Sequence, residues 1–248
     1  RAVAEALGFR VECVNRNPWA EYKRLGLEQI ELAGALDPGR APKLVVADLT
    51  TKRTTTKPGA PFTTATLQQT ASNALRFSAS RTMRVAQGLY EGVDLNGEGR
   101  VGLITYMRTD STNLSPDALG SVRRFIQDQY GAPYLPEHPN FFGKRQERAQ
   151  EAHEAIRPTE PQRTPESVRA ALTDEQYRLD DLIWKRFVTC QMTAAQWDST
   201  SVSVTCDTAR GTARFAGNGR KLVFDGFMRV AGVSSEDQIL PPLQTGQP

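Results

Sequence analysis

A change of hydrophobic pattern along the chain is the feature that most limits its fold. Residues 43–49 and the segments after Trp197 are rich in β-branched side chains, and they read as strands. Between them, apolar residues recur every three to four positions behind Ser, Thr and Pro residues that can begin helices. The simplest interpretation is an α+β protein with a helical domain inserted into an antiparallel β domain. We expect residues 1–56 and 194–248 in the β domain and residues 57–193 in the helical domain.

Individual elements follow from the same patterns. The expected strands cover residues 9–14, 43–49, 102–108, 201–205, 212–216 and 222–230. The expected helices cover residues 1–7, 63–76, 80–91, 115–131, 151–157 and 173–190, and another begins at residue 164. The expected caps are Thr63 or Thr64, Ser80, Ser115 before Pro116, and Thr173 with Gln176. Residues 15–38 and a linker over residues 54–61 are expected to be irregular.

The first two helices of the middle region outline a winged helix-turn-helix. They are short, joined by a tight turn, and followed by a glycine-rich turn and a strand. In this arrangement Arg81 and Arg84 lie on the exposed side of the second helix. The glycine-rich segment from Asp94 begins like a calcium loop, but its twelfth position is Thr105 instead of the required glutamate. We therefore interpret this segment as a hairpin turn.

The distribution of charge says more about a partner than the net charge of +3 does. No Asp or Glu occurs between Leu49 and Tyr90, and the same stretch is rich in Thr and Ser hydroxyls. Cations, hydroxyls and helix N-termini are the groups that bind phosphate oxygens. The stretch therefore predicts contact with nucleic acid, and a solvated basic face is the alternative. Its basic residues are Lys52, Arg53, Lys57, Arg76, Arg81 and Arg84.

Several classes of protein are disfavoured by composition. Nothing approaches the run of about 18 apolar residues that a membrane span needs, so we expect no membrane partner. Cys13, Cys190 and Cys206 are widely spaced and form no C-x-x-C pair, which argues against a disulfide framework and a zinc site. They favour a reducing compartment, the cytoplasm. The chain begins with Arg and has no signal peptide, which suggests a piece of a longer protein.

Tyr106 is the first candidate for chemistry. Residues two apart on a strand point the same way, so Arg108 is expected beside Tyr106. A phenol that attacks a phosphodiester must lose its proton, and the ordinary pKa of a phenol is about 10. A neighbouring guanidinium helps to lower this barrier and can hold the phosphate by two hydrogen bonds. The pair therefore suits nucleophilic attack on a phosphate.

A second cluster lies in the segment Glu-Ala-His-Glu-Ala-Ile-Arg at residues 151–157. On the expected helix, His153 and Arg157 are four positions apart and share a face. A zinc peptidase needs His-Glu-x-x-His, and the last position here is Arg, which does not bind metal. A His and Arg pair suits contact with a phosphate, and a solvated helix face is the alternative.

Taken together, these segments resemble the central region of the bacterial type IA DNA topoisomerases. The resemblance covers about residues 51–230, and the tyrosine motif is its most specific part. Residues 1–40 match nothing that we can place. The matching segments are Pro61–Gln69, Gly102–Asn113, Glu151–Pro158, Leu182–Val188 and Phe224–Phe227.

The resemblance implies a set of roles. Tyr106 would attack one strand of underwound DNA and become joined to the 5′ phosphate, while the other strand passes through the gap before the cut is resealed. Arg108 would contact the scissile phosphate, and His153 would be a phosphate or hydrogen-bond partner. Arg81, Arg84, Arg157 and Lys57 are further candidates for DNA binding. The β flanks would form an arch around DNA.

The resemblance also implies what this chain does not carry. The family binds Mg²⁺ through an Asp-x-Asp cluster in a separate domain, and no Asp-x-Asp occurs here. We therefore expect no metal ligands and no bound cofactor in this chain, and no relaxation of supercoils by the chain alone. We expect a cytoplasmic monomer that acts at the nucleoid on single-stranded segments of DNA.

Two rival interpretations stay open at this point. A winged-helix DNA-binding module without chemistry explains the basic stretch but not the motif from Tyr106 to Asn113. A tyrosine recombinase also forms a phosphotyrosine link. In that class the tyrosine usually follows its arginine and histidine partners, whereas Tyr106 precedes His153 and Arg157.

Overall fold

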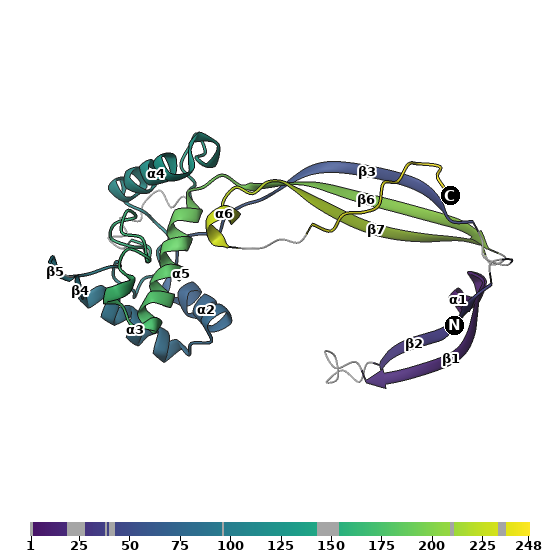
Figure 1. The fold of residues 1–248 in the computed structure, drawn as a ribbon, viewed down its shortest axis with the longest axis horizontal. Helices are drawn as coiled ribbons and strands as arrows, with labels where there is room; N and C mark the ends of the chain where they lie inside the picture. The colour runs from purple at the N-terminus through teal and green to yellow at the C-terminus, as the bar shows by residue number, and fades with distance from the viewer. Residues whose placement is uncertain are drawn as a thin grey trace. The chain divides into compact units, whose positions relative to one another are not determined.

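The computed structural model describes residues 2–18, 28–37, 39, 43–95, 97–142, 154–208, 211–232 and 237–248. The chain divides into two compact units (Figure 1). We call them the sheet unit and the helical unit. The sheet unit contains Arg1–Arg53, Asp198–Lys221 and Asp237–Pro248, and the helical unit contains Thr54–Trp197 and Leu222–Glu236. The α+β class with antiparallel sheets is confirmed. The winged-helix and arch arrangements and the domain limits stay predictions.

The sheet unit begins with helix α1 (Ala2–Ala6) and an antiparallel hairpin of β1 (Phe9–Pro18) and β2 (Glu28–Leu36). Phe9 pairs with Leu36, and a bulge between Val11 and Cys13 shifts the register. The expected short helix and first strand are confirmed. The expectation of an irregular segment over residues 15–38 is wrong, because β2 lies within it. In its sequence, Glu-Gln-Ile-Glu-Leu-Ala-Gly-Ala-Leu, apolar and polar residues alternate only weakly. The strand is therefore stabilised by its hydrogen-bonded pairing with β1 more than by its own β propensity.

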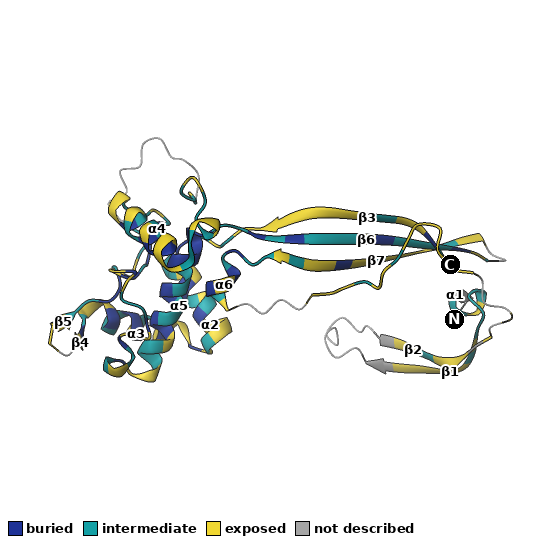
Figure 2. Ribbon diagram, turned by 45° about the horizontal axis from the view of Figure 1, so that its top comes forward, coloured by how far each residue is buried: buried dark blue, intermediate teal, exposed yellow. Residues whose placement is uncertain are grey.

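A three-stranded sheet has the order β3–β6–β7, with β3 at Val45–Thr56, β6 at Ala195–Thr208 and β7 at Gly211–Phe224. The central strand β6 is covered more than its two neighbours (Figure 2). The strand expected at residues 43–49 is confirmed, but it continues through the first part of the expected linker.

The strand expected at residues 222–230 is wrong beyond Phe224. The backbone turns at Gly226, whose φ is +51°, and helix α6 follows at Met228–Ala231. A Cβ atom at position 226 would lie 2.5 Å from the carbonyl oxygen of Thr193. Only glycine fits this turn, because it has no Cβ and tolerates a positive φ. Phe227 then donates its backbone N–H to that same oxygen of Thr193 at 2.9 Å.

The helical unit is built around α5 (Asp174–Cys190), which contacts α2 (Thr64–Leu75), α3 (Ala79–Glu91), α4 (Pro116–Tyr130) and α6 (Figure 1). One apolar cluster joins the α2–α3 pair to α5, and a second joins α4 to α5. The burial of α5 on both sides explains why its apolar positions are so numerous. No helix among the described residues has the length and apolar character to cross a membrane.

Local sequence signals placed most helix ends correctly. The hydroxyls of Thr63, Ser115 and Thr173 cap their helices as predicted, and Gln176 completes the capping box of α5. The predicted cap at Ser80 is wrong. The cap is Ser78, two residues earlier, whose hydroxyl accepts the backbone N–H of Arg81. The helix predicted from residue 164 is also wrong. Turns and a short 3-10 helix η3 (Arg169–Ala171) occupy that segment, and a second short one, η2, covers Ala132–Tyr134.

The predicted hairpin turn is confirmed, and it joins β4 (Val93–Leu95) to β5 (Gly99–Val101). The regular strand predicted at residues 102–108 is wrong, because only Ile104 forms a bridge, with Pro158. The helix predicted at residues 151–157 is wrong for its described part. There Ile156 bridges to Phe62, so the chain is extended and uses its backbone groups for tertiary pairing.

Asp180 is an acidic side chain inside the helical unit, and only 4% of its surface is exposed. Burial, helped by the negative charge of Asp181, raises the pKa of Asp180 to about 7. The folded protein therefore holds a proton on this carboxyl between about pH 4 and pH 7, where the unfolded chain does not. A raised pKa of an acid means that stability is lost as the pH rises through this interval.

We predict that Asp180→Asn raises the free energy of unfolding at pH 8 by roughly 2–4 kcal/mol, because each unit of pKa shift is worth about 1.4 kcal/mol. At pH 4.5 the gain should be small, since the native carboxyl is then already neutral. Urea unfolding at both pH values measures the two free energies. Asp128→Asn, at an exposed position on α4, is the control and should change stability by less than about 0.5 kcal/mol at either pH. An equal effect of Asp180→Asn at both pH values would contradict the prediction.

Candidate active site around Tyr106

Tyr106 lies on an irregular segment between the β4–β5 hairpin and α4. Its side chain is 45% exposed, whereas Ile104 and Met107 on the same segment are buried. Arg108 is exposed as well, so Tyr106 and Arg108 alternate with the buried Met107. Over residues 106–108 the segment therefore shows the side-chain alternation of a strand, without a continuous ladder. The predicted placement of Tyr106 and Arg108 on one exposed side is consistent with this alternation.

The residue before Tyr106 is fixed by an extended segment on the other side. Thr105 donates its backbone N–H to the carbonyl oxygen of Arg157 at 2.9 Å. The Thr105 hydroxyl donates to the carbonyl oxygen of Ala155 at 2.8 Å and accepts the backbone N–H of Arg157 at 3.0 Å. Three hydrogen bonds therefore hold Thr105 against residues 155–157.

The residues after Tyr106 are fixed by the first turn of α2. The hydroxyl of Thr64 donates to the carbonyl oxygen of Met107 at 2.8 Å and accepts the backbone N–H of Thr109 at 2.9 Å. The backbone N–H of Thr64 donates to the carbonyl oxygen of Thr109 at 2.8 Å. Tyr106 therefore stands between two anchored points, and the backbone that presents its ring is held in place from both sides.

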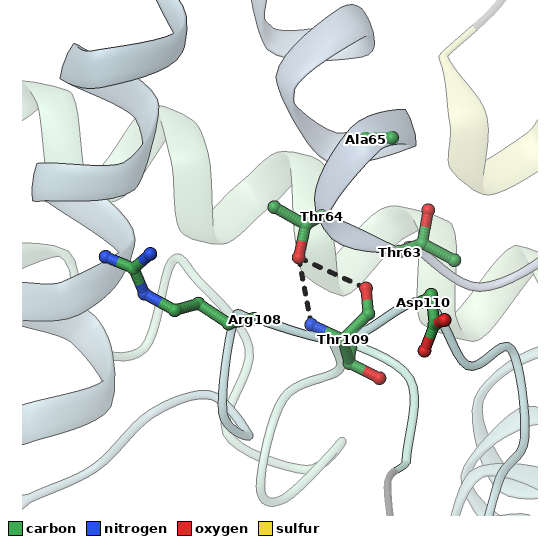
Figure 3. Close-up of a pocket in the computed structure, with 6 residues that line it drawn as sticks. All are labelled: Thr63, Thr64, Ala65, Arg108, Thr109 and Asp110. Carbon is green, nitrogen blue, oxygen red and sulfur yellow. Dashed lines mark hydrogen bonds between the residues drawn. The ribbon is translucent and has the colours of Figure 1, made fainter.

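Arg108 reaches into solvent beside the amino end of α2. It lines a pocket of ≈ 460 Å³ with Thr63, Thr64, Ala65, Thr109 and Asp110. Figure 3 shows Arg108 extending to one side of Thr109 and Asp110 lying on the other. The amino end of a helix carries a partial positive charge, so the Arg108 side of this pocket favours an anion. The carboxylate of Asp110 opposes an anion on its own side.

Tyr90 is a site residue that sequence reasoning missed. Its side chain is 41% exposed near the end of α3. Its ring meets the ring of Tyr106 edge to face, with centroids 5.4 Å apart and planes at 64°. The sequence held one signal for this contact. The hairpin turn predicted in the glycine-rich segment from Asp94 brings the residues before and after it together, and Tyr90 and Tyr106 lie on its two sides.

The arginines predicted to bind DNA differ in their surroundings. Arg81 forms an ion pair with Glu175 and lies over the ring of Phe77 at 4.5 Å. Arg84 and Lys57 are exposed. The prediction that Arg81 and Arg84 lie on the exposed side of α3 therefore agrees with the structure. The guanidinium of Arg81, however, is already paired with the carboxylate of Glu175.

Arg157 is engaged inside the protein. Its side chain is 13% exposed, it pairs with Glu154 at 2.6 Å, and it donates to the carbonyl oxygen of Pro158 at 3.0 Å. Its expected partner on a helix face, His153, lies outside the described residues. The structure leaves Tyr106 and Arg108 exposed two residues apart on one segment, and it gives Arg157 a part in fixing the segment that holds Thr105.

Glu154 completes this support. One of its carboxylate oxygens accepts the backbone N–H of Ser115, the cap of α4, at 2.6 Å, and the other accepts from Arg157. Burial alone would raise the pKa of Glu154, but the hydrogen bonds from Ser115 and Arg157 outweigh it and lower the pKa. Glu154 is therefore a carboxylate that joins the start of α4 to the segment behind Tyr106, a role that sequence reasoning missed.

Comparison with known proteins identifies the family to which this arrangement belongs. A sequence model of the family described as DNA topoisomerase matches residues 28–248. The chain belongs to the bacterial type IA DNA topoisomerase family. DNA topoisomerase 1 of Haemophilus influenzae is 46% identical over 222 residues, which are 88% of this chain and 24% of that protein. DNA topoisomerase 1 of Pseudomonas aeruginosa is 46% identical over 224 residues, 89% of this chain and 24% of that protein.

A solved structure of the same family extends the comparison to the fold. Full-length topoisomerase I from Thermotoga maritima matches with a TM-score of 0.71 and 37% identity, over 83% of this chain and 32% of that chain. This type IA topoisomerase chain spans about a quarter of the length of the curated relatives that it matches. Membership in the family is incompatible with the tyrosine recombinase interpretation.

Nowhere within the residues that the structure describes do three His, Cys, Asp or Glu side chains gather as a metal site. The expectation that Mg²⁺ binds in another part of the enzyme stays a prediction.

Proposed function

We propose that this chain is the tyrosine-bearing part of a longer topoisomerase that cuts and reseals one strand of DNA. The observation that carries the proposal is the placement of Tyr106. Its ring is exposed, its backbone is anchored on both sides, and the exposed guanidinium of Arg108 lies two residues away on the same segment. A packing tyrosine needs neither this exposure nor this cationic neighbour.

In the proposed step, the phenolic oxygen of Tyr106 attacks the phosphorus of a DNA phosphodiester. The phenol loses its proton, a bond forms between the tyrosine oxygen and phosphorus, and the bond from phosphorus to the 3′ oxygen breaks. The 3′ oxygen takes a proton and leaves as a hydroxyl, so the 5′ phosphate stays on Tyr106. Resealing is the reverse reaction. One phosphodiester replaces another, and the cycle consumes no ATP.

Arg108 is proposed to hold and neutralise the phosphate during this step. A guanidinium can donate two hydrogen bonds to a phosphate, and its charge offsets the negative charge that develops on the equatorial oxygens. The amino end of α2, which borders the same pocket, adds to this field. Arg84 and Lys57 are exposed cations that can contact the DNA backbone further away.

The substrate is proposed to be a single-stranded segment of negatively supercoiled DNA. Passage of the uncut strand through the gap, after cleavage and before resealing, changes the linking number and relaxes the DNA. Relaxation is expected to require the remaining domains of the enzyme, including the domain that holds the proposed Mg²⁺ site. This chain alone should bind DNA weakly and relax none. The working enzyme is proposed to act as a monomer at the nucleoid.

The test is to join this chain to the remaining domains of the Haemophilus influenzae relative and to supply Mg²⁺ with negatively supercoiled plasmid. We expect relaxation by the joined protein and none by the chain alone, as resolved on agarose gels. A joined protein that binds single-stranded DNA without relaxing plasmid or forming a covalent adduct would favour the alternative, a winged-helix binding module without chemistry. Relaxation by the chain alone would contradict the expected need for the other domains.

A further inference from the structure

We propose that Tyr90 is a positioning residue, whose ring holds the side chain of Tyr106 in the orientation from which it attacks. This inference rests on the proposed role of Tyr106 as the nucleophile. It adds a second aromatic side chain to the site. Arg108 is proposed to hold the phosphate, whereas Tyr90 is proposed to orient the side chain of Tyr106.

The contact itself has the geometry that aromatic rings prefer. The edge-to-face arrangement of Tyr90 and Tyr106, at 5.4 Å and 64°, places the positive rim of one ring against the negative face of the other. Tyr90 and Tyr106 keep 41% and 45% of their surface exposed, and neither belongs to the buried core cluster of the helical unit. Tyr90 is also the last but one residue of α3, where the helix could have ended with a small or charged side chain.

The backbone is built to bring these two rings together. Leu103 donates its N–H to the carbonyl oxygen of Leu89 at 2.9 Å, which joins the end of α3 to the segment of Tyr106. A Cβ atom at position 102 would lie 2.7 Å from the carbonyl oxygen of Tyr90, so only glycine allows this close approach. Leu89 is fully buried and fixes the end of α3 in the core. The separation of Tyr90 and Tyr106 is therefore set by the fold.

A held ring matters because the anchors of Tyr106 act only on its backbone. The bonds at Thr105 and Thr64 fix the backbone, but an exposed side chain can still occupy up to three χ1 rotamers. Nucleophilic attack needs the phenolic oxygen in one of them, since misplacement by about 1 Å slows such reactions severely. An edge-to-face contact is strong enough to favour one rotamer by about three- to tenfold.

The experiment uses the joined protein with Mg²⁺ and an end-labelled single-stranded oligonucleotide. Tyr90→Leu and Tyr90→Met remove the aromatic ring, and Tyr90→Phe keeps it. We expect the single-turnover rate of adduct formation at saturating DNA to fall about three- to tenfold in the Leu and Met variants. The Phe variant should stay within twofold of the parent, and the Kd for DNA should change less than twofold in all three.

A spectroscopic measurement reports the orientation of Tyr106 directly. All six tyrosines are replaced by 3-fluorotyrosine, and the ¹⁹F signal of residue 106 is the one missing from Tyr106→Phe. Loss of the neighbouring ring current should move and narrow this signal in Tyr90→Leu and Tyr90→Met but not in Tyr90→Phe. Tyr177→Leu is the matched control, because it removes a partly buried tyrosine packed on the same core away from the site. It should change neither the signal nor the rate.

The outcomes separate this inference from the proposed function. If Tyr106→Phe still forms the adduct, the nucleophile assignment itself is wrong. If Tyr106→Phe forms none while Tyr90→Leu keeps the parental rate and signal, only the positioning role is overturned. A Tyr90→Phe variant as slow as Tyr90→Leu would assign the effect to the hydroxyl. A loss of DNA affinity equal to the loss of rate would make Tyr90 a DNA contact instead.

Discussion

Replacing Tyr106 by Phe is expected to abolish the covalent protein–DNA adduct, with a loss of rate of at least about 10⁴-fold in the joined protein. The substitution removes one oxygen atom and nothing else from the ring. Without it, the enzyme has no atom to attack phosphorus at that position. Denaturing gels of end-labelled oligonucleotide incubated with Mg²⁺ measure the adduct.

Folding and DNA binding serve as controls for this variant. Because the ring of Tyr106 is exposed and no hydrogen bond of its hydroxyl occurs within the described residues, Tyr106→Phe should unfold at the parental urea concentration. Its Kd for single-stranded DNA should change less than about threefold. An adduct of normal yield from Tyr106→Phe would end the assignment of this residue as the nucleophile.

Replacing Arg108 by Ala is expected to slow adduct formation by about 10²–10³-fold, the loss that follows removal of one preorganised donor to a developing charge. The Kd for DNA should rise only a few-fold, because many other contacts hold the backbone and this one strengthens in the transition state. Arg108→Lys should recover part of the rate, since lysine restores the charge but not the two-pronged hydrogen bonding. Single-turnover rates at saturating DNA and separate binding titrations provide the two numbers.

Arg124→Ala is the matched control for Arg108→Ala. Arg124 is an exposed arginine on α4, in the same helical unit, and its loss changes the net charge by the same amount. We expect both the rate and the Kd of Arg124→Ala to stay within about twofold of the parent. Equal losses of rate and affinity in Arg108→Ala would show that Arg108 only anchors DNA and does not act on the cleaved phosphate.

Local signals explain which parts of the fold could be predicted. The Thr173 and Gln176 capping box and the Ser115–Pro116 start are short-range devices whose chemistry is complete within a few residues, and the structure contains both. Strand β2 depends on pairing with the strand before it, and the segment at residues 154–158 depends on partners far along the chain. Their backbone groups pair with β1, Phe62 and Thr105, and no local pattern encodes those partners.

The candidate site divides in the same way. Tyr106 and Arg108 were singled out mainly by the resemblance of residues 102–113 to the family motif, and two-residue spacing on an extended chain relates their side chains. Tyr90 was missed, because a helical pattern assigns an aromatic residue to the buried side by type alone. Glu154 was missed for a further reason. Its hydrogen-bond partner, Ser115, is 39 residues earlier in the chain. Only the folded structure shows that the Glu154 carboxylate accepts the backbone N–H of Ser115 at the start of α4.

The most direct test of the proposed mechanism is to identify the residue that is covalently linked to DNA in the adduct. The adduct from the joined protein is digested with nuclease and then with trypsin, and the peptides are sequenced by mass spectrometry. The account predicts a nucleotide linked through its 5′ phosphate to Tyr106 in the peptide of residues 101–108, Val-Gly-Leu-Ile-Thr-Tyr-Met-Arg. A nucleotide on any other peptide, or linked through a 3′ phosphate, would contradict it.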